Sequence, residues 1–436
     1  MAAKLRKNGP KADKSLALQP IHNQVFAYNL FLVLYQLGIR LAAVFNAKAR
    51  AWLDGRAGLL KKIQIELEGN RQKMIWIHSA SLGEFEQGRT LIEAIKKQYP
   101  QVKILVTFFS PSGYEVRKNY KGADHVFYLP MDGKKNAEKF IEIIQPSLAI
   151  FIKYELWNYY LNTLHQKKIP TILISAIVLP TQSYFGVFGK FFQNMLNLFS
   201  HIFVQDQQSL TLLSQLNITA PCSIGGDTRF DRVHQIANDH FSHAAIEYFC
   251  KESRVLIAGS TWTEDENALA AVQEKIPDLK FIIAPHEIHA SHIASIKKSF
   301  KDAVCLSEFN NDPSTKVLII DSIGMLSKIY RYATLAYVGG GFNASGIHNV
   351  LEAAVYGKIV LWGPHYNRSA EASTMLKIGC GYSFQTHQEL FSIVNRSLQD
   401  EQWREEKNQQ ASNFVKDNIG ATSRIMVFLQ DSTLLA

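Results

Sequence analysis

The chain has 436 residues, enough for two domains with well-buried cores. Hydrophobic residues make up 47% of it and charged residues 19%, a balance that excludes an intrinsically disordered protein. The formal net charge of +9 suits an anionic partner, which could be nucleic acid, lipid headgroups or an acidic substrate. The 4 cysteines are widely spaced and form no CxxC pair, so neither a zinc site nor a disulfide framework is indicated.

The N-terminal region joins a basic extension to an uncharged apolar segment. Residues 1–14 contain Lys4, Arg6, Lys7, Lys11 and Lys14. No Asp, Glu, Lys or Arg follows from Ser15 to Ile39, and basic residues resume at Arg40. The apolar core of this segment predicts a membrane-associated helix that either spans the bilayer or lies in its interface. The third alternative is a core helix of the first domain.

Short apolar runs alternate with helical patterns along the rest of the chain. This alternation is typical of parallel sheets whose strands are joined by crossover helices. We therefore expect an α/β protein of the GT-B type, with two Rossmann-like domains facing each other across a cleft. The expected segments are a basic, polar extension (1–24), a membrane-associated helix (25–50), an N-terminal Rossmann-like acceptor domain (51–226), a linker (227–253), a C-terminal Rossmann-like donor-binding domain (254–415) and a C-terminal helix or tail (416–436).

A carboxylate follows the first predicted strand. Met74–His78 has the pattern of a buried strand and Phe85–Gln98 that of a helix, so Glu84 lies at the turn between them. Open α/β sheets bind ligands at this edge, where a carboxylate can act as a general base. The alternative is a side chain that only complements the helix dipole.

Three consecutive glycines end a predicted strand of the second domain. The apolar run Leu335–Val338 leads into Gly339–Gly341 and then to a helix that starts near Asn349. Such a turn lets backbone N–H groups approach a phosphate. Glu352 lies near that helix start, where its carboxylate could reach ribose hydroxyls. Because the GxGxxG fingerprint is absent, the pattern favours a nucleotide-sugar over a dinucleotide.

Six short motifs stand in order along the chain. They are HSASLGE (78–84), TFFSPSG (107–113), ELW (155–157), GDTRFD (226–231), HNVLEAA (348–354) and GPH (363–365). Together they resemble motifs of the 3-deoxy-D-manno-octulosonic acid (Kdo) transferases of lipopolysaccharide synthesis. The chain departs from the family pattern where Asn158 and Val350 replace prolines and Arg229 replaces the more common lysine.

The resemblance implies an inverting GT-B glycosyltransferase that transfers Kdo from CMP-Kdo to a lipid A precursor (lipid IVA). It implies no metal or other cofactor. It also implies attachment to an anionic surface, the cytoplasmic face of the inner (plasma) membrane of a Gram-negative bacterium. No nucleic-acid partner is expected, since no RNA-binding or recognition-helix signature is present, and the sequence gives no oligomeric state.

The resemblance also assigns roles to residues. Glu84 is the expected general base. The residues expected to contact or orient the acceptor are Ser79, Ser81, Ser112 and Glu155. Those expected to bind CMP-Kdo are Arg229, Ser260, Pro285, His286, Ile323, Gly324, Met325, Asn349, Val350, Leu351 and Glu352.

Two other functions remain open at this point. One is a GT-B enzyme that uses a UDP-sugar and a lipid-linked acceptor, which an assay of donor preference would separate. The other is a non-catalytic, basic membrane-binding protein on this fold, which the intact Glu84 argues against. His286 and His289 faintly suggest metal ligands, but the sequence provides no evident third ligand.

Overall fold

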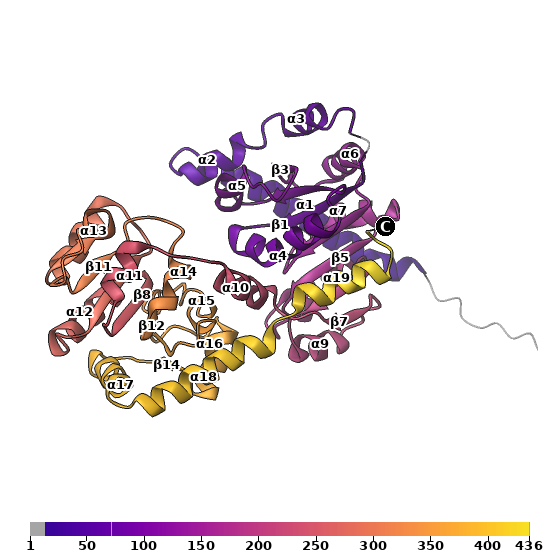
Figure 1. Cartoon of the computed structure of the whole chain (residues 1–436). Helices are drawn as coiled ribbons and strands as arrows, with labels where there is room; N and C mark the ends of the chain where they lie inside the picture. The colour runs from indigo at the N-terminus through magenta and orange to yellow at the C-terminus, as the bar shows by residue number, and fades with distance from the viewer. Residues whose placement is uncertain (1–13, 71, 436) are drawn as a thin grey trace, which may run out of the picture. The chain divides into compact units, whose positions relative to one another are not determined.

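A computed structural model describes residues 14–70 and 72–435, which form two compact units (Figure 1). Unit 1 runs up to Thr228 and also contains the chain from Ala421 onward, while unit 2 comprises Arg229–Gly420. Lys4, Arg6, Lys7 and Lys11 of the expected basic extension lie outside the described residues.

Unit 1 is built on a seven-stranded parallel sheet in the order β3-β2-β1-β4-β5-β6-β7. The strands are β1 (Met74–Ser79), β2 (Lys103–Phe108), β3 (His125–Tyr128), β4 (Leu148–Ile152), β5 (Thr171–Ala176), β6 (His201–Val204) and β7 (Cys222–Ile224). They alternate with α4 (Leu82–Gln98), α5 (Pro111–Arg117), α6 (Lys134–Ile144), α7 (Asn158–Gln166), the 3-10 helix η1 (Ser183–Phe185), α8 (Gly189–Leu196) and α9 (Gln207–Ser214). The strands are almost continuously apolar because helices cover both faces of the sheet.

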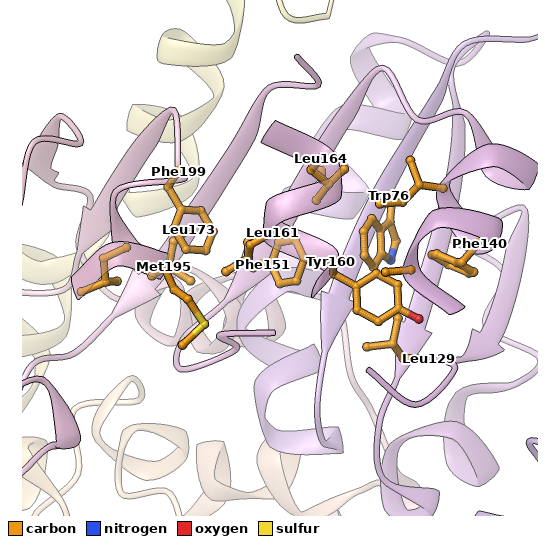
Figure 2. Packing of buried hydrophobic residues seen from close by; sticks show 14 of the residues in the cluster. Trp76, Leu129, Phe140, Phe151, Tyr160, Leu161, Leu164, Leu173, Met195 and Phe199 are labelled. Carbon is orange, nitrogen blue, oxygen red and sulfur yellow. The ribbon is translucent and has the colours of Figure 1, made fainter. Parts of the chain in front are cut away.

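Aromatic side chains fill one face of this sheet. Figure 2 shows Trp76 of β1 close to Phe140 of α6 and Tyr160 of α7. The centroid of the Trp76 ring lies 5.1 Å from that of Phe140 and 5.5 Å from that of Tyr160, both in edge-to-face geometry. All three side chains are fully buried, so this cluster fixes β1 against its helices.

Among the described residues, three helices precede the sheet of unit 1: α1 (Lys14–Ala42), α2 (Ala47–Asp54) and α3 (Leu59–Glu66). One stripe of α1 packs onto unit 1, where Leu32 is buried. On the same stripe the Tyr28 hydroxyl donates to Asp132 Oδ2 at 2.6 Å, and Asn29 Oδ1 accepts from the Tyr159 hydroxyl at 2.7 Å. The segment Asn23–Ala42 is long and apolar enough to cross a membrane, yet specific polar contacts attach it to the domain.

Unit 2 contains a second seven-stranded parallel sheet, in the order β10-β11-β9-β8-β12-β13-β14. Its strands are β8 (Val255–Thr261), β9 (Lys280–Pro285), β10 (Ala303–Cys305), β11 (Val317–Ile319), β12 (Leu335–Val338), β13 (Val360–Trp362) and β14 (Gly381–Ser383). Its helices are α10 (Thr228–Asn238), α11 (Ala244–Cys250), α12 (Thr263–Lys275), α13 (Ala290–Ser299), η2 (Leu306–Glu308), α14 (Leu326–Ile329), η3 (Tyr330–Tyr332), α15 (Leu351–Ala354), α16 (Ala370–Ile378), α17 (His387–Gln399) and α18 (Glu401–Asn418). The expected α/β class with two parallel sheets is confirmed.

One segment differs from the sequence-based expectation, and the expected C-terminal helix is present. Residues 227–253, expected to be a linker, form α10 and α11, and Ile246 and Phe249 of α11 are buried in the core of unit 2. The chain then ends with α19 (Ala421–Asp431), which packs against α4 of unit 1. There the hydroxyls of Thr90 and Thr422 lie 2.8 Å apart and share a hydrogen bond.

Candidate active site

The strand order of unit 1 reverses between β1 and β4, which are neighbours in the sheet. Chain connections leave such a pair of strands in opposite directions, and ligands of open α/β sheets bind in the resulting crevice at the carboxyl ends. Glu84 follows β1, and Glu155 follows β4. The topology therefore brings two carboxylates from distant motifs to one switch point.

Glu84 lies in the first turn of α4, which begins at Leu82, three residues earlier than the sequence suggested. Ser81 is the N-cap of this helix. Its backbone N–H donates to Glu84 Oε2 at 3.0 Å, and its hydroxyl accepts from the backbone N–H of Glu84. This reciprocal capping box fixes the carboxylate at the end of β1. Glu84 therefore has a structural role at the N-terminus of α4, as the alternative interpretation of the sequence expected. The same capping box also orients its carboxylate.

The protonation of Glu84 is unusual for a capping carboxylate. Burial raises its pKa to about 7, and the negative charge of Glu155 acts in the same direction. Hydrogen bonds from the backbone of Ser81 and Ala80 oppose the rise, as does the charge of Lys153. A carboxyl group with a pKa near neutrality can accept a proton and still release it, which is what general-base catalysis requires.

A chain of buried hydrogen bonds holds Glu155. Trp76 Nε1 donates to Thr107 Oγ1 at 2.8 Å, and the same hydroxyl lies 2.8 Å from His78 Nδ1. His78 Nε2 lies 3.1 Å from Glu155 Oε2, which also accepts from Trp157 Nε1 at 2.7 Å. With the proton on Nε2 of His78, every donor in this chain has an acceptor, and the carboxylate of Glu155 receives two hydrogen bonds. We therefore assign this tautomer.

The serines expected near the acceptor lie in different environments. Ser79 is fully buried at the end of β1, and its Oγ has no hydrogen-bond partner among the described residues. Ser112 lies in the first turn of α5, where its hydroxyl is 3.0 Å from that of the N-cap residue Ser110. Of the expected acceptor residues, only Ser81 and Glu155 are linked to Glu84 through hydrogen bonding or charge.

The glycines Gly339–Gly341 of unit 2 were expected to let a phosphate approach the backbone. The structure gives a different reason for them, which is close packing of backbone against backbone. A Cβ on Gly339 would lie 2.3 Å from the carbonyl oxygen of Ser260, and one on Gly341 would lie 2.5 Å from the backbone nitrogen of Gly363. The N–H of Gly339 donates to Gly259 O, so it is not available to a phosphate. These glycines allow backbones to pack closely where β8, β12 and β13 end.

Asp265 of α12 fixes the same loop. Its carboxylate accepts hydrogen bonds from the Tyr337 hydroxyl at 2.6 Å and from the backbone N–H groups of Gly340 and Trp262, both at 2.9 Å. Burial raises the pKa of Asp265, and these three donors oppose the rise. The carboxylate thus connects the loop after β12 to the start of α12, at the switch point between β8 and β12.

Three rings stack at this switch point. The centroid of the His286 ring, after β9, lies 4.7 Å from that of Trp262 and 4.7 Å from that of His348, in near-parallel orientation on both sides. Burial, and then the neighbouring charge of His286, lower the pKa of His348 to about 4. The expected donor residue His286 is thereby fixed between two rings, and its backbone N–H donates to the carbonyl oxygen of Thr261 at 3.0 Å. The preceding residue, Ser260, has a left-handed backbone with φ 54°.

Other expected donor residues lie in loops at the same edge of the sheet. Gly324 has a positive φ of 96°, and a Cβ at this position would meet no heavy atom within 4 Å, so a ligand can approach its backbone. Asn349 Oδ1 accepts from the N–H of Leu351, and its side-chain amide lies 3.4 Å from Glu352 Oε1. The helices that follow, α14 and α15, have 4 residues each, so their dipoles contribute little.

Arg229 lies on α10, and its environment differs from that of a solvated surface arginine. It forms an ion pair with Glu371 of α16, a mostly buried carboxylate that also accepts from the Ser369 hydroxyl at 2.8 Å. The guanidinium is therefore held in place, with its charge partly neutralised by Glu371. The sequence did not point to Glu371 or Asp265. His78, Thr107 and Trp157 lie in the motifs quoted above, but no role was expected for them.

A metal centre is not visible in the part of the chain that the structure describes. Among residues 14–70 and 72–435, no group of three or more His, Cys, Asp and Glu side chains is arranged to hold a metal ion. His289 instead forms an ion pair with Glu287 at 3.0 Å.

Two Rossmann-like sheets, with a carboxylate pair at one switch point and a fixed glycine loop at the other, define a protein of the GT-B fold class. Residues 52–232 match the family model described as 3-deoxy-D-manno-octulosonic-acid transferase (kdotransferase). The chain is 28% identical over 384 residues to the 3-deoxy-D-manno-octulosonic acid transferase of Rickettsia felis, covering 84% of this chain and 80% of the relative. It is 27% identical over 380 residues to the protein of that name from Haemophilus influenzae, covering 82% and 86%.

Solved structures agree on the fold. A putative UDP-N-acetylglucosamine 2-epimerase from Listeria monocytogenes superposes with a TM-score of 0.58 at 13% identity, covering 83% of this chain and 97% of that one. The chain is therefore similar over most of its length to the 3-deoxy-D-manno-octulosonic acid (Kdo) transferases. It is a glycosyltransferase of lipopolysaccharide biosynthesis.

Proposed function

We propose that the protein transfers Kdo from CMP-Kdo to a hydroxyl group of a lipid A precursor (lipid IVA), with Glu84 as general base. The observation that carries this proposal is the carboxyl group of Glu84, fixed by a capping box at the carboxyl edge of the sheet, with its pKa raised to about 7. A helix cap alone needs only an acceptor oxygen. A raised pKa at the ligand-binding edge of the sheet makes Glu84 a candidate acid–base group.

The bond changes follow from an inverting transfer. Glu84 removes the proton from the acceptor hydroxyl, and the resulting oxygen attacks the anomeric carbon of Kdo from the face opposite CMP. The bond between that carbon and the phosphate oxygen breaks, and CMP leaves with the electron pair. The proton remains on Glu84 until it passes to solvent. The hydrogen bonds from His78 and Trp157 hold the Glu155 side chain in place.

The loops of unit 2 would hold the donor. Glu352 is the candidate for the ribose hydroxyls, and the exposed backbone at Gly324 is the candidate for the phosphate. The stacked ring of His286 offers an edge to the nucleotide, and Arg229 offers a fixed positive charge to the Kdo carboxylate or the phosphate. Ser260, Pro285, Ile323, Met325, Val350 and Leu351 would contribute the surrounding surface.

We also propose that α1 lies in the membrane interface and does not span the bilayer. Its packed stripe is hydrogen-bonded to unit 1 through Tyr28 and Asn29, whereas the opposite stripe exposes large apolar side chains: Phe26, Leu30, Val33, Leu34, Leu37 and Leu41. A spanning helix would have to break the packed contacts. This arrangement supports attachment to the cytoplasmic face of the inner (plasma) membrane of a Gram-negative bacterium, where Arg40, Lys48 and Arg50 would meet anionic headgroups.

Donor preference tests the function. Purified protein, lipid A precursor and CMP-Kdo generated in situ should give products whose mass increases by one or more Kdo residues. UDP-sugars offered under the same conditions should give no product. Transfer from a UDP-sugar instead would contradict the proposal and favour a GT-B enzyme that uses UDP-sugars. No transfer from any donor would contradict it and favour a non-catalytic membrane-binding protein.

Vesicle sedimentation tests the membrane assignment. Leu34→Glu with Leu41→Glu places two charges on the exposed stripe and leaves the packed stripe intact, so the protein should fold and stop sedimenting with anionic vesicles. Val427→Glu, an exposed apolar position on α19, is the matched control and should sediment like the unmodified protein. Equal sedimentation of all three proteins would show that α1 is not the membrane contact.

A further inference from the structure

An apolar groove of 610 Å³ lies in unit 1, formed by α1 on one side and by the chain from η1 to α8 on the other. Ala27 and Phe31 contribute from α1, and Val187 and Phe192 from the opposite side. None of the described residues that line it carries a charge. Its volume falls in the range of small-molecule sites, and its lining suits a hydrocarbon chain.

The lining of the groove is uncharged, and charges of both signs lie around it. Two carboxylates accept hydrogen bonds from lining residues: Asp132 from the Tyr28 hydroxyl and Glu155 from Trp157 Nε1. Basic residues stand on the same helices as the lining, with Arg40 on α1 and Lys190 on α8. The uncharged, apolar lining therefore complements the hydrocarbon part of an amphiphile.

Trp157 joins the groove to the candidate active site. It is one of the lining residues, and its Nε1 donates to Glu155 Oε2 at 2.7 Å. Its ring also contacts Phe109, with a centroid distance of 4.7 Å, in the loop that precedes Ser112. A hydrocarbon chain in the groove would therefore place an attached polar headgroup beside the residues that surround Glu84.

We propose that this groove binds one acyl chain of the lipid acceptor during Kdo transfer. The inference rests on the proposed function, because it assumes an acylated, anionic acceptor at Glu84. The rim of the groove carries the exposed side chains of Val187 and Phe188, through which a chain can slide in from a lipid phase. The groove thus recognises the acyl chain of the acceptor, which is a different part of the acceptor from the hydroxyl group that reacts.

A series of acceptors with short, water-soluble acyl chains of increasing length tests this proposal. Each added methylene that enters the groove should lower KM about fourfold, the equivalent of ~0.8 kcal/mol. Ala27→Trp fills the groove and Val187→Glu places a charge at its rim. Both variants should flatten this dependence on chain length and leave the affinity for CMP unchanged. Val427→Trp, at an exposed apolar position of α19 in the same unit, is the control and should keep the full dependence.

The outcomes separate the two proposals. If the unmodified protein transfers Kdo to no acceptor, the proposed function falls, and the groove loses its occupant with it. If the unmodified protein is active but KM does not change with chain length, or if both groove variants keep the full dependence, the acyl-chain assignment is wrong while the function stands. If both variants lose vesicle binding and keep the dependence on soluble acceptors, the groove holds bulk membrane lipid and the proposal is overturned.

Discussion

The two switch points of this molecule have the same topology and different chemistry. In unit 1, the ends of β1 and β4 carry carboxylates, and burial and mutual repulsion hold the pKa of Glu84 near neutrality. In unit 2, the ends of β8 and β12 carry a closely packed glycine loop and stacked rings, and the carboxylate of Asp265 is fully engaged by three donors. Both carboxylates are at least partly buried and accept hydrogen bonds, and the difference is that Glu84 has the second carboxylate, Glu155, beside it. The comparison teaches that a neighbouring charge can distinguish two sites on one fold.

Glu84→Gln removes the proposed general base of unit 1 and should have the largest effect. Gln keeps the cap acceptor and cannot take the proton, so turnover should fall by ~100- to 10,000-fold. The pKa of Glu84 is raised on folding, so its stabilising contribution is present below its ordinary value near 4.5 and is lost as pH rises through about 7. The variant should therefore be at least as stable as the unmodified protein above pH 7. Product mass and thermal unfolding measure the two effects.

The matched control is Glu86→Gln on the same helix, whose carboxylate forms an ion pair with Arg117. It should retain near-normal turnover. Loss of activity in the Glu86 variant with normal activity in the Glu84 variant would exchange their roles and remove Glu84 from the mechanism.

Asp265→Ala attacks the corresponding carboxylate of unit 2 and should act through stability. It leaves three donors without their acceptor, two of them backbone groups, which costs about 3 kcal/mol. Calorimetric unfolding should show a lower transition for unit 2, together with weaker CMP binding. Tyr337→Phe removes only one of the donors and should cost about 1 kcal/mol. Normal stability in both variants would mean that Asp265 does not hold the loop.

Glu352→Ala tests the binding character of unit 2 without disturbing its packing. Loss of a charged acceptor for the ribose should weaken CMP by roughly 1–3 kcal/mol, measured by titration calorimetry. Glu401→Ala, an exposed carboxylate of α18 in the same unit, should leave affinity unchanged. Equal affinities in the two variants would take Glu352 out of the donor site.

Glu155→Gln should produce the smallest change, a shift in pH dependence. The rate constant kcat/KM should rise with pH through about 7, because Glu84 must be ionised. Removing the negative charge of Glu155 lowers the pKa of Glu84, so the midpoint should move to lower pH by up to about one unit. Burial remains the larger cause and should keep the midpoint above the range of an ordinary Glu. An unchanged midpoint, with Glu93→Gln as reference, would show that the two carboxylates are not coupled.

The sequence predicted most strands of the two parallel sheets, but it did not predict all of the helices between them. Apolar runs identified most strands, since buried parallel strands are apolar throughout. Residues 227–253 were expected to be a linker because their helices are polar on most positions and bury only a few side chains, among them Ile246 and Phe249. The sequence predicted a helix that starts near Asn349. In the structure this helix, α15, is short and ends at Ala354.

The candidate site was predictable where it is local. The motif from His78 to Glu84 contains the strand end, the N-cap and the carboxylate within one short stretch, so its geometry follows from the sequence. The partners of Glu155 could not be found this way, because Thr107 and His78 reach each other across 29 residues and His78 reaches Glu155 across 77. Asp265 was missed for the same reason, since its donors Tyr337 and Gly340 lie more than 70 residues away. The assigned roles of the donor residues stay predictions.

The return of α19 to unit 1 has a consequence for how the protein is made. Unit 2 is inserted into unit 1, because the chain leaves unit 1 after Thr228 and re-enters it at Ala421. The re-entering helix packs against α4, the helix that carries Glu84, and buries Ile425 and Leu429 there. During synthesis, the first unit to leave the ribosome is therefore the last to be completed. A chain truncated before α19 would retain every candidate site residue and still lack the helix that supports Glu84.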